Sequence, residues 1–79
     1  MSQVTVYSSN YCGSCLMVKE YLQLKDVPFV EKNVSADNNS KDELLSLGFD
    51  TTPVTVVGNV TIRGFDTRQL DLAIASLDK

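Results

Sequence analysis

The residues best suited to chemistry are the two cysteines, Cys12 and Cys15, which Gly13 and Ser14 separate. A helical pattern begins directly after Cys12, so this cysteine is predicted to lie where unpaired backbone N–H groups and the helix dipole favour an anion. A thiolate is such an anion, so this position should lower the pKa of Cys12 from its free value of about 8.5. Cys15 falls on the same helical face, within reach of a disulfide after a small adjustment of the first turn. The spacing predicts reversible thiol–disulfide exchange.

Two other interpretations of the cysteine pair are an unreactive buried thiol pair and half of a zinc site. A closed zinc site takes four ligands, typically cysteine and histidine. The chain has no histidine and no second cysteine pair. A C-x-x-C near a predicted βαβ unit is typical of a redox motif. We therefore expect redox chemistry, with no metal ligands and no tightly bound cofactor.

The elements that position the cysteines follow the order β-α-β-α-β-β-α, which is an α/β fold. After a strand at 3–7, the stripe Cys15, Val18 and Leu22 predicts a helix that turns Cys15 to the core and leaves Cys12 exposed. A second strand at 29–34 should run parallel to the first, since a helix joins the two. The other predicted elements are a short helix through Leu44, Leu45 and Leu47, strands at 54–57 and 60–63 around a Gly58-Asn59 turn, and a last helix that buries Leu70, Ala73, Ile74 and Leu77.

Two helix starts have capping patterns. Ser40 with Glu43 predicts a capping box for the middle helix, and Asp66 with Gln69 predicts a cap for the last one. Capping alone would explain Asp66, although a contact with the amine of a ligand is compatible with it. Four further acidic residues are expected to form a solvated face: Asp37, Asp42, Glu43 and Asp50.

Length and charge limit the partners. A chain of 79 residues predicts one domain, 1–79. Its net charge of −3 and its lack of a basic cluster argue against nucleic acid and anionic membranes as partners. It has no apolar run long enough to span a bilayer and no cleavage pattern after Met1, so we expect a cytoplasmic protein, acting as a monomer.

Three features together resemble the glutaredoxin branch of the thioredoxin-like fold, and within it the NrdH-redoxins. They are the C-x-x-C after the first strand, the Thr51-Thr52-Pro53-Val54 segment, and Gly64-Phe65-Asp66 after the hairpin. The resemblance implies a four-stranded mixed sheet flanked by three helices, with the first and third strands adjacent. It also implies that Pro53 is cis and packs against the cysteine pair.

The same resemblance implies a substrate-binding surface around the cysteines. The Thr52 backbone would pair with a substrate peptide as an added strand. Tyr11 and Phe65 either cover core edges or form an apolar rim that receives a partner's disulfide. Gly64 and Asp66 complete the candidate binding set, Asp66 as a possible contact for the γ-glutamyl amine of glutathione.

The chain departs from the glutaredoxin pattern where glutathione would bind. Ser9 stands where a basic residue is usual, three positions before the first cysteine, and Gly48-Phe49-Asp50 lacks a second cation. A charge-assisted hydrogen bond to a glutathione carboxylate would be missing at each. Gly64-Phe65 matches the NrdH-redoxin turn, whereas Asp66 matches the glutaredoxin acid.

We therefore expect a dithiol redoxin that reduces protein disulfides, with ribonucleotide reductase as one candidate acceptor. A thioredoxin-reductase-type flavoenzyme or glutathione would re-reduce it. One alternative is a glutathione-dependent glutaredoxin that acts on glutathionylated proteins. Another is a dimer that holds an iron–sulfur cluster through Cys12 and glutathione, since some glutaredoxins with Cys-Gly at this position do so. Visible colour would distinguish the cluster-bound form.

Overall fold

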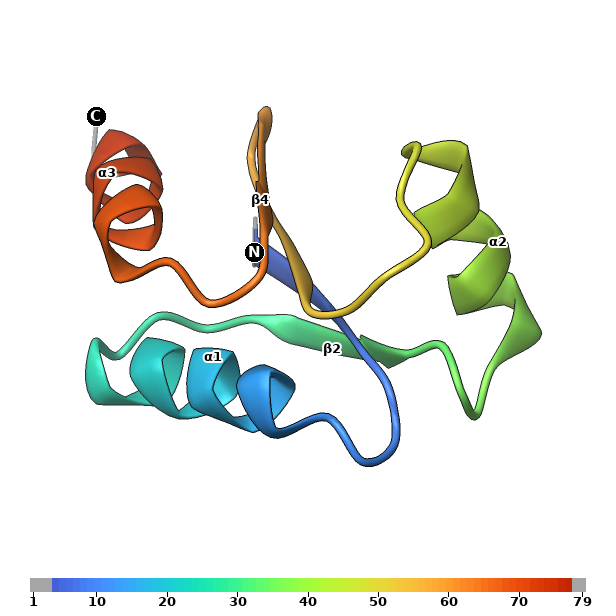
Figure 1. Cartoon of the computed structure of the whole chain (residues 1–79). Coiled ribbons are helices and arrows are strands. Elements are labelled where there is room, and N and C mark those ends of the chain that lie inside the picture. Colours follow the sequence, from blue (N-terminus) through green and yellow to red (C-terminus); the bar gives the residue numbers. More distant parts are fainter. Residues whose placement is uncertain (1–3, 78–79) are drawn as a thin grey trace.

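The computed structural model describes residues 4–77, and it confirms the predicted order of elements (Figure 1). The strands are β1 (Val4–Ser8), β2 (Val30–Asn33), β3 (Val54–Val57) and β4 (Val60–Arg63). The helices are α1 (Gly13–Leu24), α2 (Asn38–Ser46) and α3 (Thr67–Leu77). The predicted start of the first strand at Gln3, and the predicted burial of Leu77, lie outside the described residues and side chains.

The four strands form one mixed sheet in the order β2-β1-β3-β4. β1 pairs in parallel with β2, as expected for strands joined by a helix, and antiparallel with β3. β3 and β4 form a hairpin in which Val57 faces Val60 across the predicted Gly58-Asn59 turn. The carboxyl end of β1 and the amino end of β3 therefore lie side by side, which brings the segments around Cys12 and Pro53 to one end of the sheet.

The larger core lies between the sheet and the helices α1 and α3, which Figure 1 shows on the same side. Each of these helices follows its predicted apolar stripe, so Val18 and Leu22 are fully buried and so is Leu70. Ile74 is only partly buried and packs against the edge of this core. The buried residues of the cluster are Val4, Val6, Val18, Leu22, Val57, Ile62, Leu70 and Ala73.

The other face of the sheet is covered by α2 over a smaller core of Tyr7, Leu44 and Val54. A polar contact supplements this packing: the Tyr7 hydroxyl and the Lys32 ammonium both bind Glu43 Oε1, at 3.0 and 2.6 Å. Lys32 and then Tyr7 hold the pKa of Glu43 below its usual value. The helix stripe is narrower than predicted, because Leu45 and Leu47 are about half exposed.

The predicted capping box of α2 is wrong. The N-cap is Asp37, whose carboxylate accepts hydrogen bonds from the Asn39 N–H and the Ser40 hydroxyl. The N-cap therefore lies three residues before Ser40, the helix begins at Asn38, and Glu43 turns to the sheet. The four acids predicted to be solvated are all exposed, and two of them, Asp37 and Glu43, also have structural partners. An aspartate satisfies the free N–H groups of a first turn as well as serine does, so both positions were competent caps.

Candidate redox site

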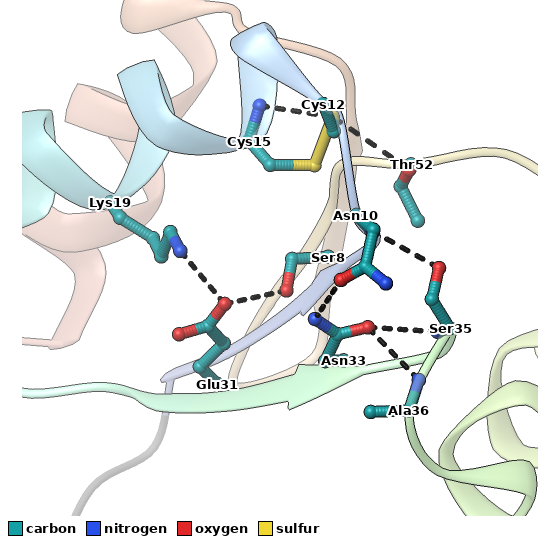
Figure 2. Close-up of polar contacts among 10 residues, drawn as sticks. All are labelled: Ser8, Asn10, Cys12, Cys15, Lys19, Glu31, Asn33, Ser35, Ala36 and Thr52. Carbon is teal, nitrogen blue, oxygen red and sulfur yellow. Dashed lines mark hydrogen bonds and ion pairs between the residues drawn. A yellow bond between two sulfur atoms is a disulfide. The ribbon is translucent and has the colours of Figure 1, made fainter.

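Cys12 and Cys15 form a disulfide at the start of α1 (Figure 2). Their Cα atoms lie 5.3 Å apart, within the usual range for a disulfide. Cys12 is the N-cap of the helix: its backbone is extended, and its Sγ accepts a hydrogen bond from the Cys15 N–H at 3.2 Å. A sulfur in this position receives one of the free N–H groups of the first turn, as the sequence predicted.

The two cysteines differ in their exposure to solvent. Cys15 is 1% exposed and shares the buried stripe of α1 with Val18 and Leu22, whereas Cys12 is partly exposed. The predicted contrast between an accessible and a covered cysteine is confirmed. A disulfide exchanged at this site can therefore be reached from outside through Cys12.

The loop before β3 brings a second donor to Cys12. The Thr52–Pro53 peptide bond is cis, as the resemblance implied, and Pro53 is buried. The Thr52 hydroxyl lies 3.8 Å from Cys12 Sγ and 2.6 Å from the Ser9 hydroxyl. Within residues 4–77, the Thr52 backbone N–H and C=O form no hydrogen bond. That backbone is therefore free for an added strand, while contact of Pro53 with the cysteines stays a prediction.

The turn after β4 lies beside the Thr52–Pro53 segment. The Gly64 N–H donates to the Pro53 carbonyl at 2.8 Å, and its φ of 79° is in the left-handed region that glycine adopts easily. Asp66 Oδ1 accepts the Gln69 N–H at 3.1 Å, so its predicted role as a helix cap is confirmed. Phe65 packs edge-on to Tyr21, with ring centroids 6.1 Å apart, and covers an edge of the larger core.

Tyr11 behaves differently from Phe65. Its side chain is fully exposed, and its backbone has a φ of 60°, in the left-handed region that a residue with a Cβ rarely adopts. It lines the pocket that contains both cysteines. Of the two aromatic residues, Phe65 therefore covers core, and Tyr11 stands free at the rim beside Cys12.

The same pocket, of about 340 Å³, contains a charged group that sequence reasoning missed. Glu31 Oε2 accepts hydrogen bonds from the Lys19 ammonium at 2.8 Å and from the buried Ser8 hydroxyl at 2.7 Å (Figure 2). Lys19 and then Ser8 hold the pKa of the Glu31 carboxyl below its usual value. Lys19 lies four residues after Cys15, a spacing that would have placed both on one helical face, but nothing in the sequence pointed to Glu31.

The loop that carries Ser9 and Cys12 is fixed by its neighbours on the β2–α2 connection. The Asn10 N–H donates to the Ser35 hydroxyl at 3.1 Å, and the Asn33 side-chain amide donates to the Asn10 side-chain oxygen at 3.2 Å (Figure 2). Asn33 in turn accepts the N–H groups of Ser35 and Ala36. The position of Ser9 is therefore set by contacts outside its own loop.

A second cleft, of about 310 Å³, opens from Ser9 and Thr52 towards α2. Leu44 and Leu45 give it apolar walls, and Lys41 and Asp50 each place a charge in its lining, one positive and one negative. Lys41 forms no ion pair with any other residue in the described part of the chain. The sequence has no cation at 9 or at 49–50, the positions suggested by the family resemblance, and Lys41 on α2 was not predicted to lie near the site.

Within residues 4–77, no group of three or more histidine, cysteine, aspartate or glutamate side chains is placed to hold a metal ion. In the same residues, no helix has the length and apolar character needed to cross a membrane.

Comparison with known proteins gives consistent similarities over most of the chain. The glutaredoxin family profile matches residues 4–62. A glutaredoxin-like protein NrdH from Lactococcus lactis subsp. cremoris (strain MG1363) is 33% identical over 67 residues, covering 85% of this chain and 93% of that protein. An uncharacterised glutaredoxin-like protein in the rubredoxin operon of Clostridium pasteurianum is 33% identical over 72 residues, or 90% and 96% of the two chains. The solved structure of NrdH-redoxin from Escherichia coli superposes with a TM-score of 0.80 at 25% identity, covering 87% of this chain and 91% of that one.

Proposed function

This chain belongs to the glutaredoxin family, and from that premise we propose that it is an NrdH-type protein-disulfide reductase that uses Cys12 and Cys15. One observation carries the proposal: a solvent-accessible sulfur with two hydrogen-bond donors is joined to a buried sulfur three residues away. Such a pair divides the reaction between an attacking and a resolving cysteine.

The proposed reaction proceeds in two exchanges. The Cys12 thiolate attacks a substrate disulfide, so that a Cys12–substrate bond forms, the substrate S–S bond breaks, and the first substrate sulfur leaves as a thiolate that takes a proton. The Cys15 thiol then loses its proton and attacks Cys12 Sγ, which forms the Cys12–Cys15 disulfide and releases the second substrate sulfur. Two electrons pass to the substrate, and the redoxin is oxidised.

The substrate would lie across the surface that meets Cys12. We place a substrate strand against the free backbone of Thr52, beside cis-Pro53, with Tyr11 at the open rim. Gly64, Phe65 and Asp66 would border it on the other side, because the Gly64–Pro53 hydrogen bond holds that turn next to Thr52.

The order of the cysteines is tested by trapping. Cys15→Ser should accumulate a mixed disulfide between Cys12 and a protein substrate, because the resolving thiol is absent. Cys12→Ser should accumulate none, because Cys15 is buried. Non-reducing electrophoresis with mass spectrometry of the linked peptides measures both variants. Equal trapping by the two would contradict the assignment.

The proposed electron donor is a thioredoxin-reductase-type flavoenzyme, since cations are absent at Ser9 and at 49–50. NADPH consumption with thioredoxin reductase should exceed that with glutathione and glutathione reductase, with insulin as the acceptor. A faster glutathione system would overturn the NrdH-type assignment. Ribonucleotide reductase is our candidate for the physiological acceptor, with the protein acting as a monomer in the cytoplasm, where thiols are kept reduced.

A second candidate function, glutathione-dependent reduction, is favoured by Lys41. Within the described residues its ammonium has no ion pair, and it lines the cleft beside Thr52 together with Asp50, where it is suited to a carboxylate such as that of glutathione. If glutathione uses this cleft, Lys41→Met should lower the glutathione-supported rate about tenfold, at about 1.4 kcal/mol per decade. The rate with thioredoxin reductase is the control and should be unchanged. Equal effects on both rates would contradict a carboxylate site.

A further inference from the structure

Two hydroxyl groups form a continuous chain that ends on the attacking sulfur. The Ser9 and Thr52 hydroxyls lie 2.6 Å apart, and the Thr52 hydroxyl lies 3.8 Å from Cys12 Sγ. The Cys15 N–H reaches the same sulfur at 3.2 Å from the helix side. Cys12 Sγ therefore has one donor from the backbone and one from a side chain, and only the side-chain donor has a further partner.

Each hydroxyl has only one hydrogen to donate, and this determines the direction of both hydrogen bonds once Cys12 is reduced. A hydroxyl has one hydrogen and two acceptor lone pairs. A thiolate is charged and is a stronger acceptor than a neutral hydroxyl, so the Thr52 hydrogen is directed to Cys12 Sγ. The 2.6 Å contact must then use the Ser9 hydrogen, with Thr52 Oγ1 as the acceptor. Accepting from Ser9 polarises the Thr52 hydroxyl and makes it a better donor.

The surroundings keep Ser9 in place for this task. The next residue, Asn10, is bound through its backbone to Ser35 and through its side chain to Asn33. Thr52 is held by the cis-Pro53 segment, whose carbonyl accepts the Gly64 N–H. The two hydroxyls thus come from two loops, and each loop is held in place by its own hydrogen bonds.

We propose that Ser9 is a positioning residue: its hydroxyl orients the Thr52 hydroxyl so that Thr52 donates to the Cys12 thiolate. This inference rests on the proposed function, in which Cys12 is the attacking cysteine. It assigns a role to residue 9, where this chain has a serine in place of the basic residue that is usual in glutaredoxins. In this chain, two neutral hydroxyls in series provide stabilisation of the thiolate from that side.

The test measures the pH at which Cys12 ionises in the reduced protein. The probe is the rate of alkylation by iodoacetamide across pH, with the modified cysteine identified by peptide mass spectrometry. Thr52→Val, which removes the direct donor at constant shape, should raise the midpoint by about one pH unit. Ser9→Ala should raise it by roughly 0.3 unit, through the lost cooperative strengthening. Ser9→Thr keeps a hydroxyl and should stay near the wild-type midpoint.

A double variant separates positioning from a direct effect. In the Thr52→Val background, Ser9→Ala should shift the midpoint no further, because its only route to the sulfur is gone. Ser46→Ala is the matched control, since it removes a serine hydroxyl on α2 that donates to the Asp42 carbonyl, away from Cys12, and should leave the midpoint unchanged. The proposal is overturned if the midpoint of Ser9→Ala equals that of the wild type. It is also overturned if Ser9→Ala shifts the midpoint as much in the Thr52→Val background as it does alone, or if Ser9→Thr has the same midpoint as Ser9→Ala. No acceptor protein or reductase takes part, so the result stands apart from the trapping experiment.

Discussion

The two faces of the sheet are built by different means. On one face, α1 and α3 enclose eight buried apolar residues, and the start of α1 holds the cysteines, Cys12 as its N-cap and Cys15 in its first turn. On the other, α2 packs Leu44 into a core of three buried residues and is additionally tied to the sheet through Glu43, which binds Tyr7 and Lys32. Segments with fewer buried apolar contacts open at lower free energy. The disulfide thus lies on the well-packed face, and the cleft that contains Lys41 lies on the face that is expected to unfold locally at lower free energy.

The largest effect on the free energy of unfolding should come from replacing one buried leucine by alanine in each core. Leu22→Ala removes a fully buried side chain from the larger core and should cost about 2–5 kcal/mol of unfolding free energy. Leu44→Ala, in the smaller core, should cost less, near the lower end of that range, because fewer neighbours surround the cavity. Urea denaturation of the two variants measures the difference. If Leu44→Ala lowers the free energy of unfolding as much as Leu22→Ala or more, the α2 face is not the less tightly packed one.

The sequence predicted the well-packed face better than the α2 face. On α1 and α3, regular apolar stripes such as Cys15, Val18 and Leu22 identified the buried side directly. On α2, three leucines suggested a broad stripe, yet only Leu44 is buried. A short helix held partly by polar contacts leaves little periodicity to detect.

The candidate site was likewise predictable where it depended on local pattern. The exposure of the two cysteines followed from helical spacing, and the cis bond at Pro53 followed from family resemblance. The contacts of Glu31 and Lys41 could not be predicted, because each depends on tertiary packing of residues far apart in the chain. The Ser9–Thr52 pair, separated by 43 residues, is of the same kind.

The next effect tests a helix start on the well-packed face. Asp66→Ala should cost about 0.5–2 kcal/mol, because the Gln69 N–H loses its acceptor, and Asp66→Ser should restore most of it. Thermal or urea unfolding measures both. If Asp66→Ser is stable but loses turnover with glutathione alone, Asp66 also binds the ligand amine.

A smaller loss is expected on the α2 face from Tyr7→Phe. This change removes the hydroxyl that donates to Glu43 and leaves the buried ring in place, so it should cost about 1 kcal/mol. Native-state hydrogen exchange should show faster opening of α2 amides, with those of α1 unchanged. Uniform acceleration across both helices would indicate that the two faces do not open separately.

The smallest effect is a decrease in folding stability at low pH, to which one glutamate on each face contributes. The pKa values of Glu31 and Glu43 are lowered in the folded protein, mainly by Lys19 and Lys32. Their contribution is therefore present above the pKa of the unfolded chain and is lost as pH falls through the folded values. Both pairs are partly exposed, so the effect should be small and weakened by salt. Melting temperatures from pH 6 down to 3 should fall less steeply in Glu31→Gln and in Glu43→Gln than in wild type.

The isolation of Tyr11 has an optical consequence. The chain has three tyrosines and no tryptophan, so tyrosines are its intrinsic fluorophores. The hydroxyls of Tyr7 and Tyr21 donate to the carboxylates of Glu43 and Asp71, a contact that quenches phenol fluorescence. Tyr11 is fully exposed next to Cys12, and a nearby disulfide also quenches by accepting an electron from the excited ring. Reduction should therefore brighten the ultraviolet emission, and Tyr11→Phe should remove that change, so the protein carries a label-free reporter of its own redox state.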